Sequence, residues 1–537
     1  MERKKIEQVL NEIGILLELS GENYFKARAY YQAAEVIAAL PQEPEFYLRP
    51  GEEAVIPGIG PAISKKVAEL ISTGSLAYLD KLRRQVPPEL PHLLRIPGLG
   101  AKKVNALWQK AGITSLAELE QACRENRLIT VPGFGAKSQE KILAGIAMLH
   151  KFAGSFLWPE AINIWEKFQA AVKEIPGVIK VEMTGAMRRR MEILQKLETV
   201  ILCADREEVK KGLVNVFALQ TDSRNGLQGI YEGYPVSVYL SAPFEYGTVL
   251  WETTGSAAHI QAVVEMLNNK ELDFRRIENE AEIYQLAGLP FIPPELREEG
   301  SEVKIAKEGL LPQLVTEEDV KGIFHVHTTY SDGIHTLEDM VKRAADMGME
   351  YIGFADHSQS AFYARGLKPE VLELQWKEIY DLQEKYDVKI LKGIESDILP
   401  DGSLDYPPEI LQKFDFVIGS VHSHFRMDKE AMTARICRAL TNPYLTMLGH
   451  PTGRILLTRE GYEVNMEEVI ETAGQYGKVL EINANPYRLD LDWHYCRLAK
   501  ANGVKMSINP DAHNIHELGL IVFGIGVARK GWLTKED

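Results

Sequence analysis

The stretch KGIFHVHTTYSDG at residues 321–333 begins with a short apolar run and ends in polar residues, among them two histidines. Six further apolar runs follow, separated by helix-forming stretches: YIGFADH, VKILKGIE, FDFVIGSVH, LTMLGH, VLEINAN and VKMSINPDAH. Regular alternation of short strands and helices is typical of parallel β/α folds. The pattern therefore predicts a barrel-like domain with parallel strands in this part of the chain.

Almost every one of these runs ends in a side chain that can bind a metal ion. The candidates are His325, His327, His357, Glu395, His422, His450, Asp511 and His513, and Asp332 follows the first run closely. Because the C-terminal ends of barrel strands meet at one mouth, we expect these side chains to converge there. The set is larger than one ion needs, so we predict two or three divalent ions bridged by Glu395. Imidazole combined with carboxylate favours Mn²⁺, Zn²⁺ or Fe²⁺ over Mg²⁺.

Clustered divalent ions point to hydrolysis of phosphate esters, because they acidify bound water and neutralise phosphate charge. We predict that Glu395 and His325 are catalytic. Arg454 and Arg488 could clamp the phosphate, although each could equally be a structural arginine. Ten of the thirteen histidines lie between His325 and His516. Four of these, His335, His424, His494 and His516, could be isolated residues without a ligand role.

The N-terminal part contains an internal repeat. Its copies are IPGIGPAISKKVAELI at 56–71, IPGLGAKKVNALW at 96–108 and VPGFGAKSQEKILAGI at 131–146. The glycines allow a tight turn that points a helix N-terminus at a phosphate oxygen. One copy could be a simple turn between helices, but three copies followed by lysines favour a helix-hairpin-helix grip on DNA. The predicted contacts are Gly58, Gly60, Lys65, Lys66, Gly98, Gly100, Lys102, Lys103, Gly133 and Gly135.

The charge distribution is compatible with that partner. The net charge of −15 disfavours nucleic acid, but residues 1–150 hold 19 basic and 17 acidic side chains, so the acidic excess lies later in the chain. The sequence shows neither a signal peptide nor a membrane span, and its four cysteines form no CxxC pair. We expect a monomeric cytoplasmic protein with no membrane partner.

The middle of the chain, residues 155–300, alternates apolar runs with turns, as in VIKVEMTGAM, LETVILCAD and GYPVSVYLSAP. This pattern predicts a mixed α/β region with an antiparallel sheet. A polar connection near 296–320 separates it from the C-terminal domain.

The C-terminal motifs FHVHTTYSDG, ADHS, GIESD, SVHSH, GHPTGR and NPDAH resemble those of the PHP (polymerase and histidinol phosphatase) family, over about residues 320–537. The resemblance implies a distorted β/α barrel with three metal positions. It assigns His325, His327 and Asp511 to one ion, His422 and His450 to a second, and Asp332, His357 and His513 to a third, with Glu395 bridging the first two. Ile323 stands where relatives usually have Asp, and we do not expect a ligand there.

The first 300 residues resemble family X DNA polymerases, and the joined architecture is similar to that of bacterial family X polymerases with a PHP nuclease. It implies an α-helical helix-hairpin-helix N-terminal region followed by an α/β nucleotidyltransferase-like palm and thumb. The expected domains are 1–85 (lyase-like and DNA-binding), 86–150 (fingers-like), 151–240 (palm-like), 241–298 (thumb-like), 299–320 (linker) and 321–537 (PHP). Lys66 matches a lysine that forms a Schiff base with abasic sugars, and Lys26 a lysine that contacts phosphate; both could simply contact phosphate here.

The palm departs from the family pattern. Relatives have Gly-Ser, two arginines and Asp-x-Asp where this chain has GAMRRRMEILQKLETVIL. Ala186 replaces the serine, Lys196 and Glu198 replace the two aspartates, and Ser237 replaces a third aspartate. Those three carboxylates hold the two Mg²⁺ ions of nucleotidyl transfer. We therefore predict that DNA synthesis is lost or weak.

Three functions follow from these features. The first is a metal-dependent 3′–5′ exonuclease or phosphoesterase for DNA repair, such as base excision repair, that acts on gapped, nicked or recessed DNA. The second is an active gap-filling polymerase with an exonuclease, which would also need Mg²⁺. The third is a DNA-end-binding scaffold whose PHP domain hydrolyses a small phosphate ester.

Overall fold

The computed structural model describes residues 3–40, 42–47, 56–96, 98–217, 219–221, 226–267 and 276–537. It divides into two compact units, Met1–Ala153 and Gly154–Asp537. Within the described ranges, no helix combines the length and apolar character needed to cross a membrane.

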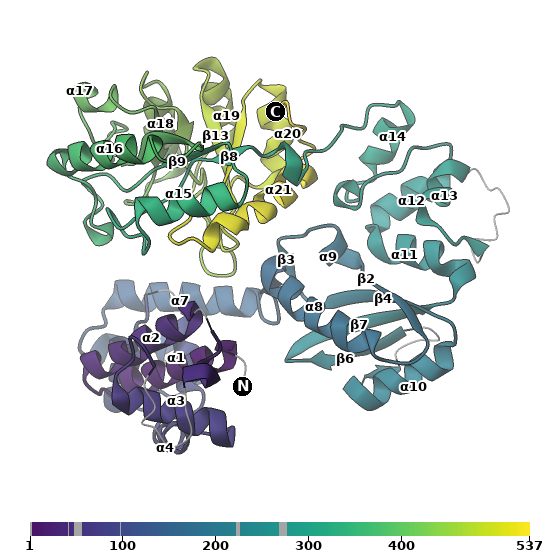
Figure 1. The fold of residues 1–537 in the computed structure, drawn as a ribbon, viewed down its shortest axis with the longest axis horizontal. Helices are drawn as coiled ribbons and strands as arrows, with labels where there is room; N and C mark the ends of the chain where they lie inside the picture. Colours follow the sequence, from purple (N-terminus) through teal and green to yellow (C-terminus); the bar gives the residue numbers. More distant parts are fainter. Residues whose placement is uncertain are drawn as a thin grey trace. The chain divides into compact units, whose positions relative to one another are not determined.

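All regular secondary structure that is described in the first unit is helical, as predicted. Its helices are α1 (Arg3–Leu19), α2 (Tyr24–Ala39), α3 (Pro61–Thr73), α4 (Ala77–Gln85), α5 (Ala101–Ala111), α6 (Leu116–Arg124) and α7 (Ala136–Lys151), with short 3₁₀ turns at Pro44–Tyr47, Leu90–Arg95 and Arg127–Thr130 (Figure 1). In α1, Ile6, Leu10, Ile13 and Leu17 follow helical spacing and are all buried. Such apolar stripes build a single core for this unit.

The second unit begins with a five-stranded sheet in the order β2-β4-β7-β6-β5. Its strands are β2 (Val178–Met183), β4 (Leu197–Cys203), β5 (Gln220–Thr221), β6 (Gly226–Tyr231) and β7 (Tyr234–Ser241). The predicted antiparallel sheet is wrong in one respect, because β4 and β7 are parallel. Between β4 and β7 the chain passes through α10 (Arg206–Phe217) and then through β5 and β6. β5 and β6 are antiparallel to each other, as are β6 and β7, and β7 lies on the edge of β4 opposite β2.

Four helices complete this part of the chain: α8 (Trp158–Lys173) and α9 (Gly185–Arg188) beside the sheet, then α11 (Tyr246–Thr254) and α12 (Ala257–Met266) after it. A two-residue antiparallel pair joins β1 (Phe156–Leu157) to β3 (Ile193–Leu194). Beyond the sheet, α13 (Glu280–Leu286) and α14 (Ser301–Lys307) pack with α12 around a separate core that includes Trp251, Val263 and Tyr284. The expected bounds of the palm-like and thumb-like domains stay predictions.

The C-terminal domain is a barrel of seven parallel strands that pair in chain order. They are β8 (Gly322–Ile323), β9 (Tyr351–Phe354), β10 (Lys389–Asp397), β11 (Phe416–Ser420), β12 (Met447–Leu448), β13 (Val479–Asn483) and β14 (Met506–Asn509). Each lies in one of the predicted apolar runs. A bridge between Val326 and Ala512 connects the two ends of the sheet, where His327 N donates to Ala512 O at 2.8 Å.

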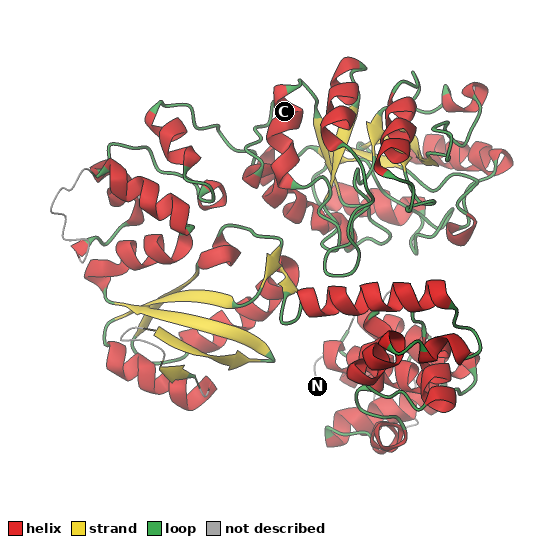
Figure 2. Ribbon diagram, turned by 180° about the vertical axis from the view of Figure 1, so that it is seen from behind, coloured by secondary structure: helices red, strands yellow, loops and turns green. Residues whose placement is uncertain are grey.

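Helices surround these strands, as Figure 2 shows. They are α15 (Leu337–Asp346), α16 (Pro369–Gln383), α17 (Pro408–Leu411), α18 (Lys429–Leu440), α19 (Met466–Gln475), α20 (Trp493–Ala501) and α21 (Ile521–Lys530). Because strand and helix alternate and all strands are parallel, their C-terminal ends share one mouth. The fold therefore places the predicted metal ligands on one side of the barrel.

Candidate metal centre and DNA-binding elements

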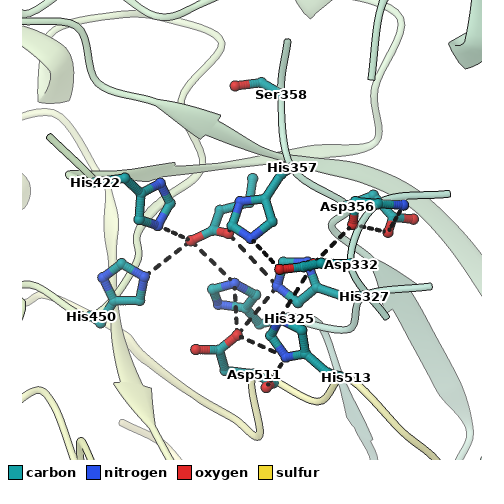
Figure 3. Close-up of polar contacts among 12 residues, drawn as sticks. His325, His327, Asp332, Asp356, His357, Ser358, His422, His450, Asp511 and His513 are labelled. Atoms are coloured by element: carbon teal, nitrogen blue, oxygen red, sulfur yellow. Dashed lines mark hydrogen bonds and ion pairs between the residues drawn. The ribbon is translucent and has the colours of Figure 1, made fainter. Parts of the chain in front are cut away.

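Glu395 lies at the centre of the predicted metal site and is almost fully buried. Its Oε1 is 3.0 Å from His450 Nε2, 3.2 Å from His422 Nε2 and 3.3 Å from His325 Nε2. Its Oε2 is 3.0 Å from His357 Nδ1 and 3.7 Å from His327 Nε2. Side chains that are far apart in the sequence therefore converge on one carboxylate (Figure 3).

The candidate ligands form three groups, in each of which the potential ligand atoms lie within 4.8 Å of one another. The groups are His325, His327 and Asp511; His327, Asp332, His357 and His513; and His357, Glu395 and His422. The first matches the set implied by the family resemblance, and the second adds His327 to the implied third set. The remaining group contains His357 and not the expected His450. His450 Nε2 nevertheless lies 3.0 Å from Glu395 Oε1.

Several imidazole nitrogens in this cluster are buried and form no well-aligned hydrogen bond among the described residues, although three of them lie 3.0 to 3.7 Å from oxygens of Glu395. They are His325 Nε2, both ring nitrogens of His327, His357 Nδ1 and His450 Nδ1. Buried polar atoms are normally satisfied, because leaving one unpaired costs free energy. A neutral imidazole can bind a cation through one ring nitrogen, so the nitrogens that face the carboxylates fit a cluster of divalent ions.

The charges of the cluster also fit metal binding. Burial alone would raise the pKa of Glu395, but the surrounding imidazoles, foremost His422 and His325, hold this pKa well below its usual range. Burial and the neighbouring His513 and His357 lower the pKa of His327 to about 4. Burial alone would lower the pKa of the other imidazoles, but the carboxylates around them raise it for His325, His357, His422 and His513. Metal binding needs ionised carboxylate and neutral imidazole, so a bound cation would displace protons from these four rings.

Two carboxylates that the sequence analysis missed form hydrogen bonds with candidate ligands. Glu481 on β13 accepts a hydrogen bond from His325 Nδ1 at 2.6 Å and another from the backbone N–H of His450 at 2.7 Å. Asp397 on β10 accepts one from His422 Nδ1 at 2.6 Å. Such carboxylates fix the orientation of a ligating imidazole. A signal was present, because Asp397 is two residues after Glu395 on one strand and so faces the same side.

The contacts of Arg454 favour the structural alternative over a phosphate clamp. Its guanidinium donates to Glu192 Oε1 at 2.6 Å, to the Arg488 carbonyl at 2.9 Å, and to Asp492. These bonds commit a mostly buried side chain to joining the palm-like region to the barrel. Arg488 lies nearer the cluster, with its Nε 3.5 Å from Asp511 Oδ2, and stays a candidate.

None of the four histidines with an uncertain role, His335, His424, His494 and His516, belongs to the three ligand groups found among the described residues. His494 Nδ1 instead bonds Asp492 at 2.5 Å. The histidines at the predicted strand ends thus belong to the cluster or contact it, and the four others do not belong to its ligand groups.

The three substituted palm positions lie together. Glu198 on β4 and Ser237 on β7 are register partners, and Lys196 Nζ is 2.8 Å from Glu198 Oε1. The other Glu198 oxygen accepts a hydrogen bond from the Ala186 backbone N–H at 3.2 Å. In the described part of the chain, each group of three or more potential metal ligands lies in the barrel domain and none in the palm.

The consecutive arginines of GAMRRR are all paired with glutamates. Arg188 bonds both oxygens of Glu280 at 2.8 Å, and Arg189 Nε bonds Glu298 Oε1 at 2.8 Å. Arg190 lies 3.3 Å from Glu295. Each of these glutamates also contacts a second cation, Arg297, Lys530 or Arg529. Three carboxylates are therefore shared among six basic side chains.

The three N-terminal hairpins share one geometry. The first glycine of each is left-handed, with φ of 80° at Gly58, 83° at Gly98 and 94° at Gly133. The next residue is buried and donates its N–H to a carbonyl three residues back at 3.0 Å: Ile59 to Ile56, Leu99 to Ile96 and Phe134 to Val131. The second glycines, Gly60, Gly100 and Gly135, are the N-caps of α3, α5 and α7. A Cβ added to any of these three would meet no atom within 4 Å, so the helix N-termini stay open to a phosphate.

The lysines that follow these turns are placed for the same partner. Lys65, Lys102 and Lys103 are exposed. Lys66 and Lys26 line a cavity of about 550 Å³ beside the first hairpin, and their Nζ atoms lie 4.9 and 6.0 Å from the centre of the Tyr78 ring. Lyase chemistry at Lys66 and the individual DNA contacts stay predictions.

Comparison with known proteins agrees with this architecture. Family models match a PHP domain at residues 324–485, a helix-hairpin-helix domain at 1–76 and a SAM-like helix-hairpin-helix tandem at 90–147. The DNA polymerase/3'-5' exonuclease PolX of Bacillus subtilis is 34% identical over 565 residues, which cover 100% of this chain and 97% of that protein. The chain belongs to the PolX family. The resemblance to bacterial family X polymerases with a PHP domain is thus confirmed.

The barrel has further relatives of its own. A probable phosphatase of Thermoanaerobacter sp. (strain X514) is 30% identical over 224 residues, covering 40% of this chain and 86% of that protein. A probable phosphatase of Caldanaerobacter subterraneus is 30% identical over 214 residues, covering 36% and 77%. This PolX chain therefore combines helix-hairpin-helix elements, which indicate DNA binding, with a phosphoesterase domain.

Proposed function

We propose that this PolX-family chain is a metal-dependent 3′–5′ DNA exonuclease or phosphoesterase in DNA repair, and that its DNA synthesis is lost or weak. The observation that carries the proposal is a complete ligand cluster around Glu395 in a chain whose palm holds a Lys–Glu pair. The proposed substrate is gapped, nicked or recessed DNA, and the proposed state is a cytoplasmic monomer.

The residues around Glu395 would hold two or three Mn²⁺ or Zn²⁺ ions, or Fe²⁺. When bound, such ions supply an acidic water and neutralise charge on the phosphate. The protein contributes the arrangement: Glu481 and Asp397 hold the rings of His325 and His422. Arg488, 3.5 Å from Asp511, offers a cation to a phosphate at the mouth.

The contacts in the palm support weak or absent DNA synthesis. Lys196 brings a positive charge to the place where polymerization needs carboxylates to bind Mg²⁺. Glu198 is engaged by Lys196 and by the Ala186 N–H.

Two alternatives have support of their own. The full-length relative in Bacillus subtilis is called a DNA polymerase/3'-5' exonuclease, which favours an active polymerase that also needs Mg²⁺. The phosphatase relatives favour a DNA-end-binding scaffold whose barrel hydrolyses a small phosphate ester.

One experiment separates the three functions. Pure protein is incubated with a 5′-labelled primer on a gapped template in Mn²⁺, with and without dNTPs. We expect the primer to shorten in both cases, the isosteric Glu395→Gln variant to lose this activity, and the His516→Ala variant, altered outside the cluster, to keep it. Lengthening with dNTPs would establish the polymerase alternative. An unchanged primer together with hydrolysis of p-nitrophenyl phosphate would establish the scaffold alternative.

A further inference from the structure

A loop beside the metal cluster carries two strongly exposed aromatic side chains. The loop spans residues 358–367, between β9 and α16, and its short 3₁₀ turn contains Phe362 and Tyr363. Phe362 is 85% exposed and Tyr363 is 69% exposed. The Tyr363 ring centre lies 5.9 Å from that of His357 and 6.3 Å from that of His422. The Tyr363 ring therefore stands at the edge of the cluster, and Phe362 is its exposed neighbour in the chain.

The loop is firmly held although its tip is exposed. Ser358 and Leu367 form a parallel bridge at its neck, next to His357. Ser360 donates its hydroxyl to Asp397 and its N–H to Asp405, both at 2.7 Å. The positions of the aromatic residues at the tip are thus set by the fold.

Gly366 closes the same loop tightly. A Cβ at this position would lie 1.8 Å from the Ser358 carbonyl oxygen. Only glycine fits there, because the two ends of the loop lie in close contact at Gly366 and Ser358. This close contact restricts how the tip of the loop can be oriented.

A second exposed aromatic residue adjoins an arginine that reaches the cluster. Tyr487 is 63% exposed, and its neighbour Arg488 approaches the candidate ligand Asp511. On the first loop, the exposed Arg365 follows Tyr363 closely. Scattered exposed aromatic residues are ordinary on a protein surface, but here aromatic and arginine side chains occur together on two loops next to one metal cluster.

Aromatic rings combined with cations are the means by which proteins hold unpaired nucleic-acid strands. The rings stack on bases of any sequence, and the cations attract the backbone phosphates. A small phosphate ester has no base to stack, so such a surface would be of no use for it. The chemistry of this edge therefore favours one occupant, an unpaired DNA strand.

We propose that Phe362, Tyr363 and Tyr487 form a stacking platform that holds the unpaired bases at a DNA 3′ end over the metal cluster. This inference rests on the proposed exonuclease function and assigns to it the residues that hold the unpaired strand. Stacking on an aromatic ring does not depend on the identity of the base. We therefore expect the platform to accept all four bases at the terminus.

The test compares a DNA substrate with a small one that has no aromatic ring. The kcat/KM of Phe362→Ala and Tyr487→Ala is measured in Mn²⁺ on a 5′-labelled single-stranded oligonucleotide and on glycerol 3-phosphate. Loss of a stacked base corresponds to about a tenfold or larger change. We expect the ratio of the two kcat/KM values to fall by about that factor, mainly through the KM for DNA, and Phe362→Trp to restore it.

Tyr476→Ala is the matched control, because Tyr476 is exposed at the C-terminal end of α19, away from the strand ends that carry the ligands. Its ratio should equal that of the wild type. Ratios within twofold of wild type for both Phe362→Ala and Tyr487→Ala would overturn the platform while the exonuclease stands. Wild-type protein that hydrolyses only the small ester would overturn the exonuclease and the platform together.

Discussion

Replacing Arg454 by alanine tests whether this residue is a structural link. Its guanidinium bonds Glu192 of the palm-like region and Asp492 of the barrel, and it also donates to the Arg488 carbonyl. The substitution leaves Glu192 mostly buried without its cation, whereas Asp492 keeps its bond with His494. The variant should therefore lose stability first and nuclease activity only as a consequence.

The expected size follows from the burial of this ion pair. Removing one partner of a buried pair costs about 3–5 kcal/mol, because the other charge stays buried and unpaired. An unfolding entropy of about 2.1 cal/mol/K per residue, applied to the whole unit Gly154–Asp537, converts this to a decrease in Tm of about 4–6 °C.

The assay is thermal unfolding followed by circular dichroism, with Arg497→Ala as the matched control. Arg497 pairs with Glu299 at 3.6 Å, but both side chains are about half exposed, and such a pair contributes at most about 1 kcal/mol. Glu192→Gln should also destabilise the protein, and the Glu192→Gln/Arg454→Ala double variant should lose less than the sum of the single losses. An Arg454→Ala variant that melts with the wild type yet has lost nuclease activity would refute the structural role and restore the phosphate clamp.

Three further predictions concern the metal ions, a hairpin and a buried carboxylate. Protein stripped with EDTA should gain about 2.7 kcal/mol in its free energy of unfolding when Mn²⁺ is added to a hundred times its Kd. A Tm that does not change on addition of Mn²⁺, Zn²⁺ or Fe²⁺ would argue against the cluster. Gly133→Ala should cost about 1–2 kcal/mol in thermal unfolding, because φ is 94° there, whereas Gly135→Ser, at an extended N-cap, should not destabilise. Burial alone would raise the pKa of Glu280, but Arg188 and Arg297 keep it below its usual range. The destabilisation of Glu280→Gln should therefore be constant from pH 7 to about 5 and shrink at lower pH, where the wild-type carboxylate gains its proton; a gap that widens on acidification would contradict this assignment.

Much of the candidate site could be predicted because its residues lie at fixed places in short sequence patterns. His357 and His450 each follow a short apolar run, and a strand end in a β/α barrel has only one mouth to face. The same holds for the hairpins, where left-handed backbone at Gly58, Gly98 and Gly133 requires glycine. The β4–β7 pairing was not predictable in this way, because strand direction depends on how the segments between two strands return the chain.

The sequence by itself determined the barrel, its ring of metal ligands and the helix-hairpin-helix repeats, since strand and helix periodicity and glycine turns are properties of neighbouring residues. Only the tertiary structure decided that Glu481 supports His325 and that Arg454 joins Glu192 rather than facing a phosphate. Those partners are separated by 156 and 262 residues. Which charges meet over such separations depends on how strands and domains pack, and no local pattern records it.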